Sequence, residues 1–157
     1  MFDHLFTPAV LIDADRMQAN IEAMQKVCDE YQTELRPHIK THKMIEATRR
    51  QLKAGAAGIT CAKLSEAEAL LPAFDESTQS SVFIAHSLAD ERKAPRLKKL
   101  ADSLDELIVA CTSEAHAPVL ERVLAAADLT LPVMMAVNTG LGREGARDID
   151  AAVRLAQ

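Results

Sequence analysis

The order of hydrophobic and polar positions along the chain predicts alternating strands and helices. Short apolar runs of the kind that form buried parallel strands recur at five places, and a stretch with helical periodicity follows each of them. These runs are residues 35–39, 58–61, 82–85, 106–110 and 131–137. Their first residues lie 23 to 25 positions apart, a regular spacing that indicates successive right-handed βαβ units and a parallel sheet.

A further strand and helix are predicted ahead of these units. The run Ala9–Ile12 has the pattern of a strand, and Asp15 is placed as the N-cap of a helix that carries an apolar stripe. Later helices are predicted to begin near Lys43, at a capping box formed by Ser65 and Glu68, at Pro95, before Leu120 and near Asp148.

Two architectures fit this pattern. A doubly wound sheet of five strands would be complete at this length. A (β/α)8 TIM barrel would need about three more units, so that the chain would hold about the first five barrel units plus the leading strand and helix. The amphipathic pattern of residues 153–157 carries no stop signal, and this favours the truncated barrel.

Composition narrows the possible partners. The 157 residues carry a formal net charge of −5, with no Trp and one Tyr, so neither a basic surface nor stacking aromatics indicate nucleic acid. The three cysteines are widely spaced and form no C-x-x-C pair, which is typical of reduced thiols in a cytoplasmic protein. No run approaches the roughly 18 apolar residues of a membrane helix.

The candidate chemistry lies in the segment from Leu35 to Lys43. His38 and Lys40 share one face of the predicted strand and stand at its carboxyl end, where α/β proteins place their active sites. Neighbouring cations, with His42 and Lys43 close by, favour an unprotonated lysine, as a Schiff-base lysine requires. The alternatives are a solvated basic turn and, for His38, an ordinary core imidazole.

A second candidate is the glycine-rich loop after the last strand run. Gly140, Gly142 and Gly145 satisfy the spacing G-x-G-x-x-G of dinucleotide-binding turns. That fingerprint normally opens the first βαβ unit, so the other interpretation is a tight loop that presents Arg143 toward the same pocket as Lys40. His86 also ends a strand run and could line the mouth of the pocket, whereas His116 is expected at the surface.

Four segments in order give the chain a resemblance to the D-threonine aldolase and D-serine dehydratase family, the relatives of alanine racemase among pyridoxal-phosphate enzymes of fold type III. They are residues 7–13 (TPAVLID), 35–43 (LRPHIKTHK), 58–68 (GITCAKLSEAE) and 138–143 (NTGLGR). The resemblance implies that residues 1–157 are an amino-terminal alanine racemase-type barrel domain, incomplete at its carboxyl end and without the carboxy-terminal β-domain. Asn138 replaces the aspartate that is usual in the last motif.

The resemblance also implies a function. Lys40 would form the Schiff base with pyridoxal 5'-phosphate, and Arg143 and His38 would contact the cofactor. The expected activity is D-threonine aldolase-like cleavage of D-3-hydroxy amino acids to glycine and an aldehyde. The alternatives are a D-serine dehydratase-like reaction and a non-catalytic cofactor-binding barrel.

For the isolated chain the resemblance implies an inactive fragment. The divalent metal, Zn or Mn, would bind only through the missing carboxy-terminal region, with no metal ligands in this chain. A homodimer that acts on small D-amino acids in the cytoplasm is expected, with neither nucleic acid nor membrane as a partner.

Overall fold

The computed structural model describes residues 2, 4–75 and 78–156. Its centre is a parallel sheet of β1 (Ile59–Cys61), β2 (Ser81–Ile84), β3 (Glu106–Cys111) and β4 (Val133–Met135) in the sequential order β1-β2-β3-β4. Thr60 is paired with Phe83, Phe83 with Ile108, and Ala110 with Met134. The predicted strands at 58–61, 82–85 and 106–110 are confirmed, each with a boundary shift of about one residue at either end.

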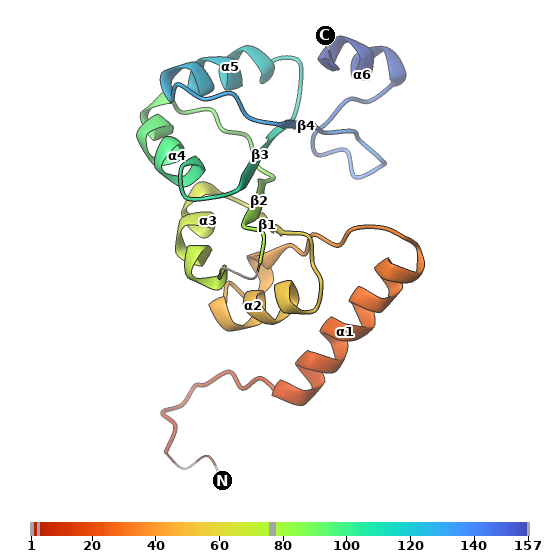
Figure 1. Cartoon of the computed structure of the whole chain (residues 1–157). Coiled ribbons are helices and arrows are strands. Elements are labelled where there is room, and N and C mark those ends of the chain that lie inside the picture. Colours follow the sequence, from red (N-terminus) through yellow and green to blue (C-terminus); the bar gives the residue numbers. More distant parts are fainter. Residues whose placement is uncertain (1, 3, 76–77, 157) are drawn as a thin grey trace.

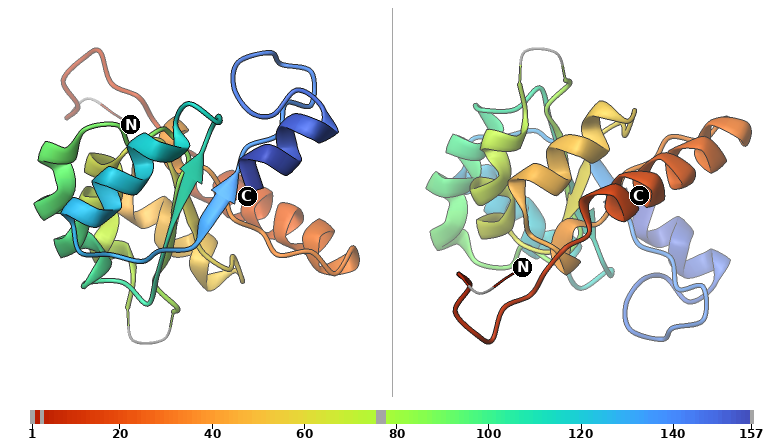
Figure 2. Two further views of the ribbon diagram at one scale, coloured as in Figure 1. Left: turned by 90° about the horizontal axis from the view of Figure 1, so that it is seen from above. Right: turned by 90° about the horizontal axis from the view of Figure 1, so that it is seen from below.

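Helices follow the strands in the alternation that the periodicity predicted. They are α2 (Ile45–Lys53), α3 (Leu64–Leu70), α4 (Ala94–Ala101), α5 (Ala117–Ala126) and α6 (Ile149–Ala156), with the 3-10 turns η2 (Leu71–Ala73) and η3 (Glu91–Lys93). Pro95 and Pro118 lie in the first turns of α4 and α5, where a missing amide hydrogen costs nothing. Helices α3, α4 and α5 cover one face of the sheet (Figures 1 and 2).

The core lies between the sheet and these helices. Alternate strand residues point into it, among them Ile59, Val82, Ile84 and Val109, all fully buried. The opposite face carries Thr60, Phe83, Ala85, Ala110 and Met134. Sequential strand order with the helices on one face is the arrangement of a TIM-barrel wall, because a doubly wound sheet reverses its strand order and has helices on both faces. The doubly wound alternative is therefore wrong.

Several local predictions are corrected by the structure. Ala9–Ile12 forms no strand in the described chain, and Val10 there is 94% exposed. Helix α1 (Ala14–Glu30) begins earlier than predicted, because Asp13 rather than Asp15 accepts from the Arg16 amide at 2.9 Å. Ser65 caps nothing, since α3 already begins at Leu64.

A polar cluster fixes the amino ends of the strands. The Arg36 guanidinium donates to Ser81 Oγ at 2.7 Å and lies 3.4 Å from Glu106 Oε2, and Ser81 Oγ also bonds that carboxylate. Gly58 lies directly against this cluster, so that a β-carbon there would come 2.2 Å from Arg36 Nη1. The opposite, carboxyl edge of the sheet is consequently free for the functional loops.

Candidate active site

The segment that carries Lys40 leaves the sheet as a turn. His38 forms a single parallel bridge with Thr60, and the chain then enters the 3-10 turn η1 (Ile39–Thr41). The Pro37 carbonyl accepts from the Thr60 amide at 2.8 Å. The predicted strand at 35–39 is thus reduced to a bridge that keeps His38 beside β1, and Lys40 lies in the turn rather than on the strand face that it was predicted to share with His38.

His38 contacts the lysine turn directly. Its Nδ1 accepts from the Lys40 amide at 3.4 Å, which makes His38 the N-cap of η1. Burial, and after it the nearby Lys40 ammonium, lower the pKa of His38, so this imidazole is neutral at neutral pH. Glu66 and His86 also act on His38 electrostatically. The structure therefore gathers His38, Lys40, Glu66 and His86 around the carboxyl end of β1.

The Lys40 side chain is exposed, and no carboxylate of the described residues lies within ion-pair distance of its ammonium. Lys43 differs, because its Nζ lies 3.1 Å from Glu66 Oε1. His42 does not join the cluster. Its Nδ1 accepts from the Met44 amide at 3.1 Å, and its ring lines a separate apolar cavity beside α1. Of the two cations expected next to Lys40, only Lys43 lies on the Glu66 side of the turn.

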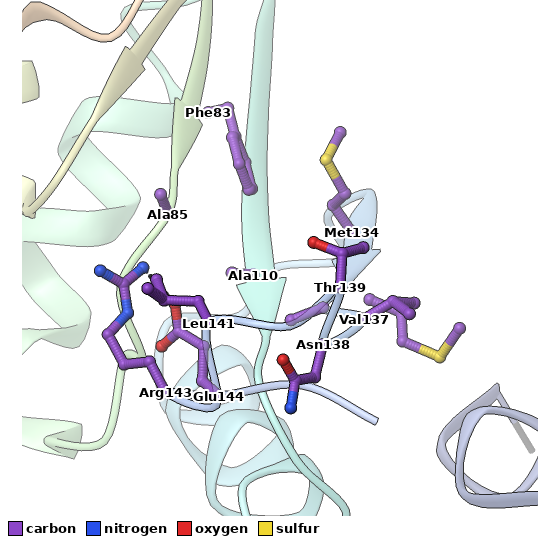
Figure 3. Close-up of a pocket in the computed structure, with 12 residues that line it drawn as sticks. Phe83, Ala85, Ala110, Met134, Val137, Asn138, Thr139, Leu141, Arg143 and Glu144 are labelled. Carbon is purple, nitrogen blue, oxygen red and sulfur yellow. Dashed lines mark hydrogen bonds and ion pairs between the residues drawn. The ribbon is translucent and has the colours of Figure 1, made fainter. Parts of the chain in front are cut away.

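A cavity of about 310 Å³ lies at the carboxyl ends of β2, β3 and β4 (Figure 3). The small side chains of Ala85, Ala110 and Ala136 leave room in the cavity, and Phe83 and Met134 contribute larger apolar side chains to its lining. The cavity has the size of a small-ligand pocket. Lys40 and His38 are not among its lining residues, and they belong to the neighbouring end of the same barrel face.

The glycine-rich loop supplies the polar side of this cavity. Arg143 and Glu144 reach into it from the loop, and Arg143 extends toward Ala85 at the end of β2 (Figure 3). The Arg143 Nη2 atom lies 2.9 Å from Glu144 Oε1, in an exposed pair. The loop presents Arg143 toward this cavity, but Lys40 does not line it, so the prediction that both residues face the same pocket stays a prediction.

Backbone hydrogen bonds close the loop. The Gly145 amide donates to the Thr112 carbonyl, the Ala146 amide to the Ala136 carbonyl and the Asn138 amide to the Ala146 carbonyl, each at 2.9 Å. The loop thus returns to β4 before α6 begins. It does not open a helix directly, as a dinucleotide-binding turn does, and that alternative has no support in the structure.

Asn138 organises the inside of the loop. Its Oδ1 accepts from the Gly140 and Gly142 amides, both at 3.0 Å. A carbonyl oxygen and a carboxylate oxygen can accept the same two bonds, so the replacement of the usual aspartate keeps this loop geometry. It removes one negative charge from the neighbourhood of Arg143.

His116 was expected at the surface, and this prediction is wrong. The residue is 7% exposed and lies at the carboxyl end of β3. Its Nδ1 accepts from the Thr112 amide at 3.2 Å, and its Nε2 lies 3.1 Å from the Leu88 carbonyl, to which it donates. Thr112 in turn carries the carbonyl that holds Gly145, so His116 supports the Arg143 loop. Pro118, which marks a helix start just after His116, was the available sequence signal.

Within residues 2, 4–75 and 78–156 there is no group of three or more His, Cys, Asp or Glu side chains that could hold a metal ion. In the same ranges no helix has the length and apolar character needed to cross a bilayer.

Comparisons with known proteins agree with this geometry. The family described as alanine racemase, N-terminal domain, matches residues 12–157. A D-threonine aldolase from Arthrobacter is 34% identical over 152 residues, and a D-threo-3-hydroxyaspartate dehydratase from Delftia is 40% identical over 105 residues. The crystal structure of D-threonine aldolase from Filomicrobium marinum superposes with a TM-score of 0.83 at 31% identity. The alignments with the Arthrobacter and Filomicrobium proteins each cover 96% of this chain, which spans only 38% and 39% of their lengths. The alignment with the Delftia enzyme covers 64% of this chain and 28% of that protein.

Proposed function

The chain belongs to the alanine racemase N-terminal domain family, and on this premise we propose that it forms the cofactor-binding barrel part of a lyase for D-3-hydroxy amino acids. The family is one of fold-type III pyridoxal 5'-phosphate enzymes. The relatives named above are enzymes of small D-amino acids. Because the chain spans less than half of their length, activity, substrate and partners of the whole protein are part of the proposal.

The position of Lys40 is the observation that carries this proposal. The bridge between His38 and Thr60 fixes the start of the lysine turn at the carboxyl edge of the barrel face, and the amine is exposed without a carboxylate partner among the described residues. An exposed lysine of this kind is available to condense with an aldehyde. The alanine-lined cavity and the Arg143 guanidinium lie on the same edge and fit a planar anionic ligand.

Each residue has a role that follows from its chemistry. Lys40 would hold the cofactor covalently and carry a proton at Nζ. His38, which burial keeps neutral, would orient the turn through the Lys40 amide. Arg143 would donate to the phenolic oxygen of the ring. Pyridoxal phosphate, when bound, supplies the electron sink for bond cleavage next to the amino-acid α-carbon.

For the reaction itself we favour retro-aldol cleavage to glycine and an aldehyde. The Arthrobacter aldolase aligns over 96% of the chain. The alternative, a dehydratase, is supported by the higher identity to the Delftia enzyme, 40% over a shorter alignment. The proposal also includes a divalent metal and a carboxy-terminal region outside these 157 residues. It further includes a homodimer and a cytoplasmic location.

Borohydride trapping tests the proposal. The chain is incubated with pyridoxal 5'-phosphate, reduced and analysed by peptide mapping, and the reduced adduct is expected on Lys40. Lys40→Ala should abolish it, whereas Lys63→Ala, which removes a neighbouring exposed lysine, should leave it unchanged. An adduct elsewhere, or an undiminished yield in Lys40→Ala, would overturn the assignment.

Product analysis separates the two reactions and the non-catalytic alternative in a protein that also holds the carboxy-terminal region. Glycine and acetaldehyde from D-threonine support the aldolase, whereas a keto acid and ammonia from D-3-hydroxyaspartate or D-serine support the dehydratase. Cofactor binding without either product would identify a non-catalytic barrel.

A further inference from the structure

Two lysines lie in the turn that follows His38, and one of them, Lys43, has an acidic partner. Both Lys40 and Lys43 are exposed. Lys43 Nζ lies 3.1 Å from Glu66 Oε1, whereas Lys40 has no carboxylate at ion-pair distance among the described residues. The proposed function requires that one particular amine of this turn condense with an aldehyde. The two amines differ in their contact with Glu66.

Glu66 is held in place from two sides. It is 8% exposed, in the first turn of α3, where a negative charge is favoured by the helix dipole. Its Oε2 accepts from the Ala62 amide at 2.8 Å, just beyond the end of β1. Its other oxygen is left for the ammonium of Lys43. The carboxylate thereby joins the end of β1 to the end of the lysine turn.

The backbone at Lys43 fits this restraint. Lys43 has φ +52°, a left-handed conformation that is uncommon for a residue with a β-carbon, and its amide closes the turn on the Ile39 carbonyl at 2.8 Å. The ion pair supplies a side-chain contact that this conformation makes possible. Lys40 lies inside the closed turn, and its side chain is left out of the pair.

The charge of Glu66 suits this pair. Burial opposes ionisation of Glu66, but the Ala62 amide and the Lys43 ammonium outweigh it and lower the pKa of the carboxyl below its ordinary value. The ionised carboxylate can therefore hold the Lys43 amine at the start of α3. Condensation needs the free lone pair of the amine: the nitrogen forms a C=N bond, its two protons leave with the carbonyl oxygen as one water, and no redox partner is involved.

We propose that Glu66 is a positioning residue that makes Lys40, rather than Lys43, the amine that condenses with an aldehyde at this site. It does so by tethering the Lys43 amine to α3 and by holding the turn closed around Lys40. This inference rests on the proposed function for its biological meaning, but it concerns a difference between two amines that any aldehyde can report.

The test compares Glu66→Gln with Glu68→Gln. Glu68 lies on the same helix and pairs with Arg96 at the surface, so the control removes one carboxylate and one ion pair from α3 without touching the lysine turn. Each protein is modified with pyridoxal 5'-phosphate plus borohydride, and separately with formaldehyde plus cyanoborohydride. Peptide mapping then gives the ratio of modified Lys43 to modified Lys40.

In the wild-type protein Lys43 should react several-fold less than Lys40 with both probes. Glu66→Gln should raise the ratio about two- to fivefold, as expected for the loss of one partly exposed ion pair. Glu68→Gln should leave the ratio unchanged. Equal reactivity of the two lysines in the wild-type protein, or an unchanged ratio in Glu66→Gln, overturns the inference.

Glu66→Asp covers the case in which Glu66→Gln does not fold, because it keeps the charge and lengthens the pair. An intermediate ratio in this variant supports the inference, and a wild-type ratio contradicts it. The two probes separate this result from the proposed function. If formaldehyde shows the expected ratios and pyridoxal phosphate leaves Lys40 unmodified, the selection by Glu66 stands and the cofactor assignment fails.

Discussion

Replacement of Gly145 by alanine tests how the Arg143 loop is held. Gly145 has φ +95°, and a β-carbon there would lie 2.8 Å from the Val137 carbonyl carbon and 2.9 Å from the Ala136 carbonyl group, all backbone atoms that cannot rotate away. Gly142 is the matched control. It has φ +71° in the same loop, and its β-carbon would meet nothing within 4 Å.

Both substitutions place alanine in a left-handed backbone, but only Gly145→Ala also brings a β-carbon against backbone atoms. A left-handed backbone costs alanine about 1–2 kcal/mol at either position. At Gly145 the backbone contacts add about 1–3 kcal/mol of overpacking. Movement of the loop would also weaken the hydrogen bond to the Thr112 carbonyl, worth about 1 kcal/mol. Gly145→Ala should therefore be less stable than Gly142→Ala by about 2–4 kcal/mol.

Urea denaturation followed by circular dichroism measures the global free energy of unfolding of both variants. Because the loop could open without global unfolding, limited trypsin digestion after Arg143 is the second readout. Cleavage there should be faster in Gly145→Ala than in Gly142→Ala. If both variants lose the same stability and are cleaved at the same rate, the close backbone approach at Gly145 does not hold the loop, and this reasoning is wrong.

Three further predictions follow from single side chains. Asn138→Leu should cost about 1–3 kcal/mol in urea denaturation by removing the acceptor of two loop amides, whereas Asn138→Asp should retain both bonds. Burial raises the pKa of the Cys61 thiol to about 12, so this cysteine should resist a thiol reagent at pH 8 until urea is added. Burial lowers the pKa of His42, so its contribution to stability should be complete above the unfolded pKa near 6.5 and lost as pH falls below it, a loss that His42→Gln should reduce in denaturation at pH 7.5 and 5.5.

The sequence predicted the sheet well because its strands are marked by local composition. Runs such as 82–85 and 106–110 are rich in branched apolar residues, and prolines mark the first turns of two following helices. Ala9–Ile12 has similar composition but forms no strand in the described structure. A strand exists only when another backbone pairs with it, and pairing is a property of the fold that a local pattern cannot report.

Only part of the candidate site could be predicted, because its segments are brought together by the fold and not by a local pattern. The bridge to Thr60 keeps His38 beside β1, but the strand alternation that was predicted to reach Lys40 stops there, because the chain turns at Ile39. Glu66 lies in the first turn of α3, where an acidic residue is common. Its bond to Lys43 joins segments far apart in the sequence, and only the fold brings these partners together.

Lys40 and Arg143, the two cations proposed to bind the cofactor, are both positioned through the backbone segments that carry them. The loop that carries Arg143 is held by backbone bonds from Gly145 and by the Asn138 amide oxygen, and the exposed pair with Glu144 is of the kind that contributes little energy. The turn that carries Lys40 is held by the ion pair between Lys43 and Glu66. In both cases the backbone is held while the charged group stays available, because Lys40 has no carboxylate partner among the described residues and Arg143 has only an exposed one. A ligand that arrives at this edge would therefore meet placed cations without first having to break a strong ion pair.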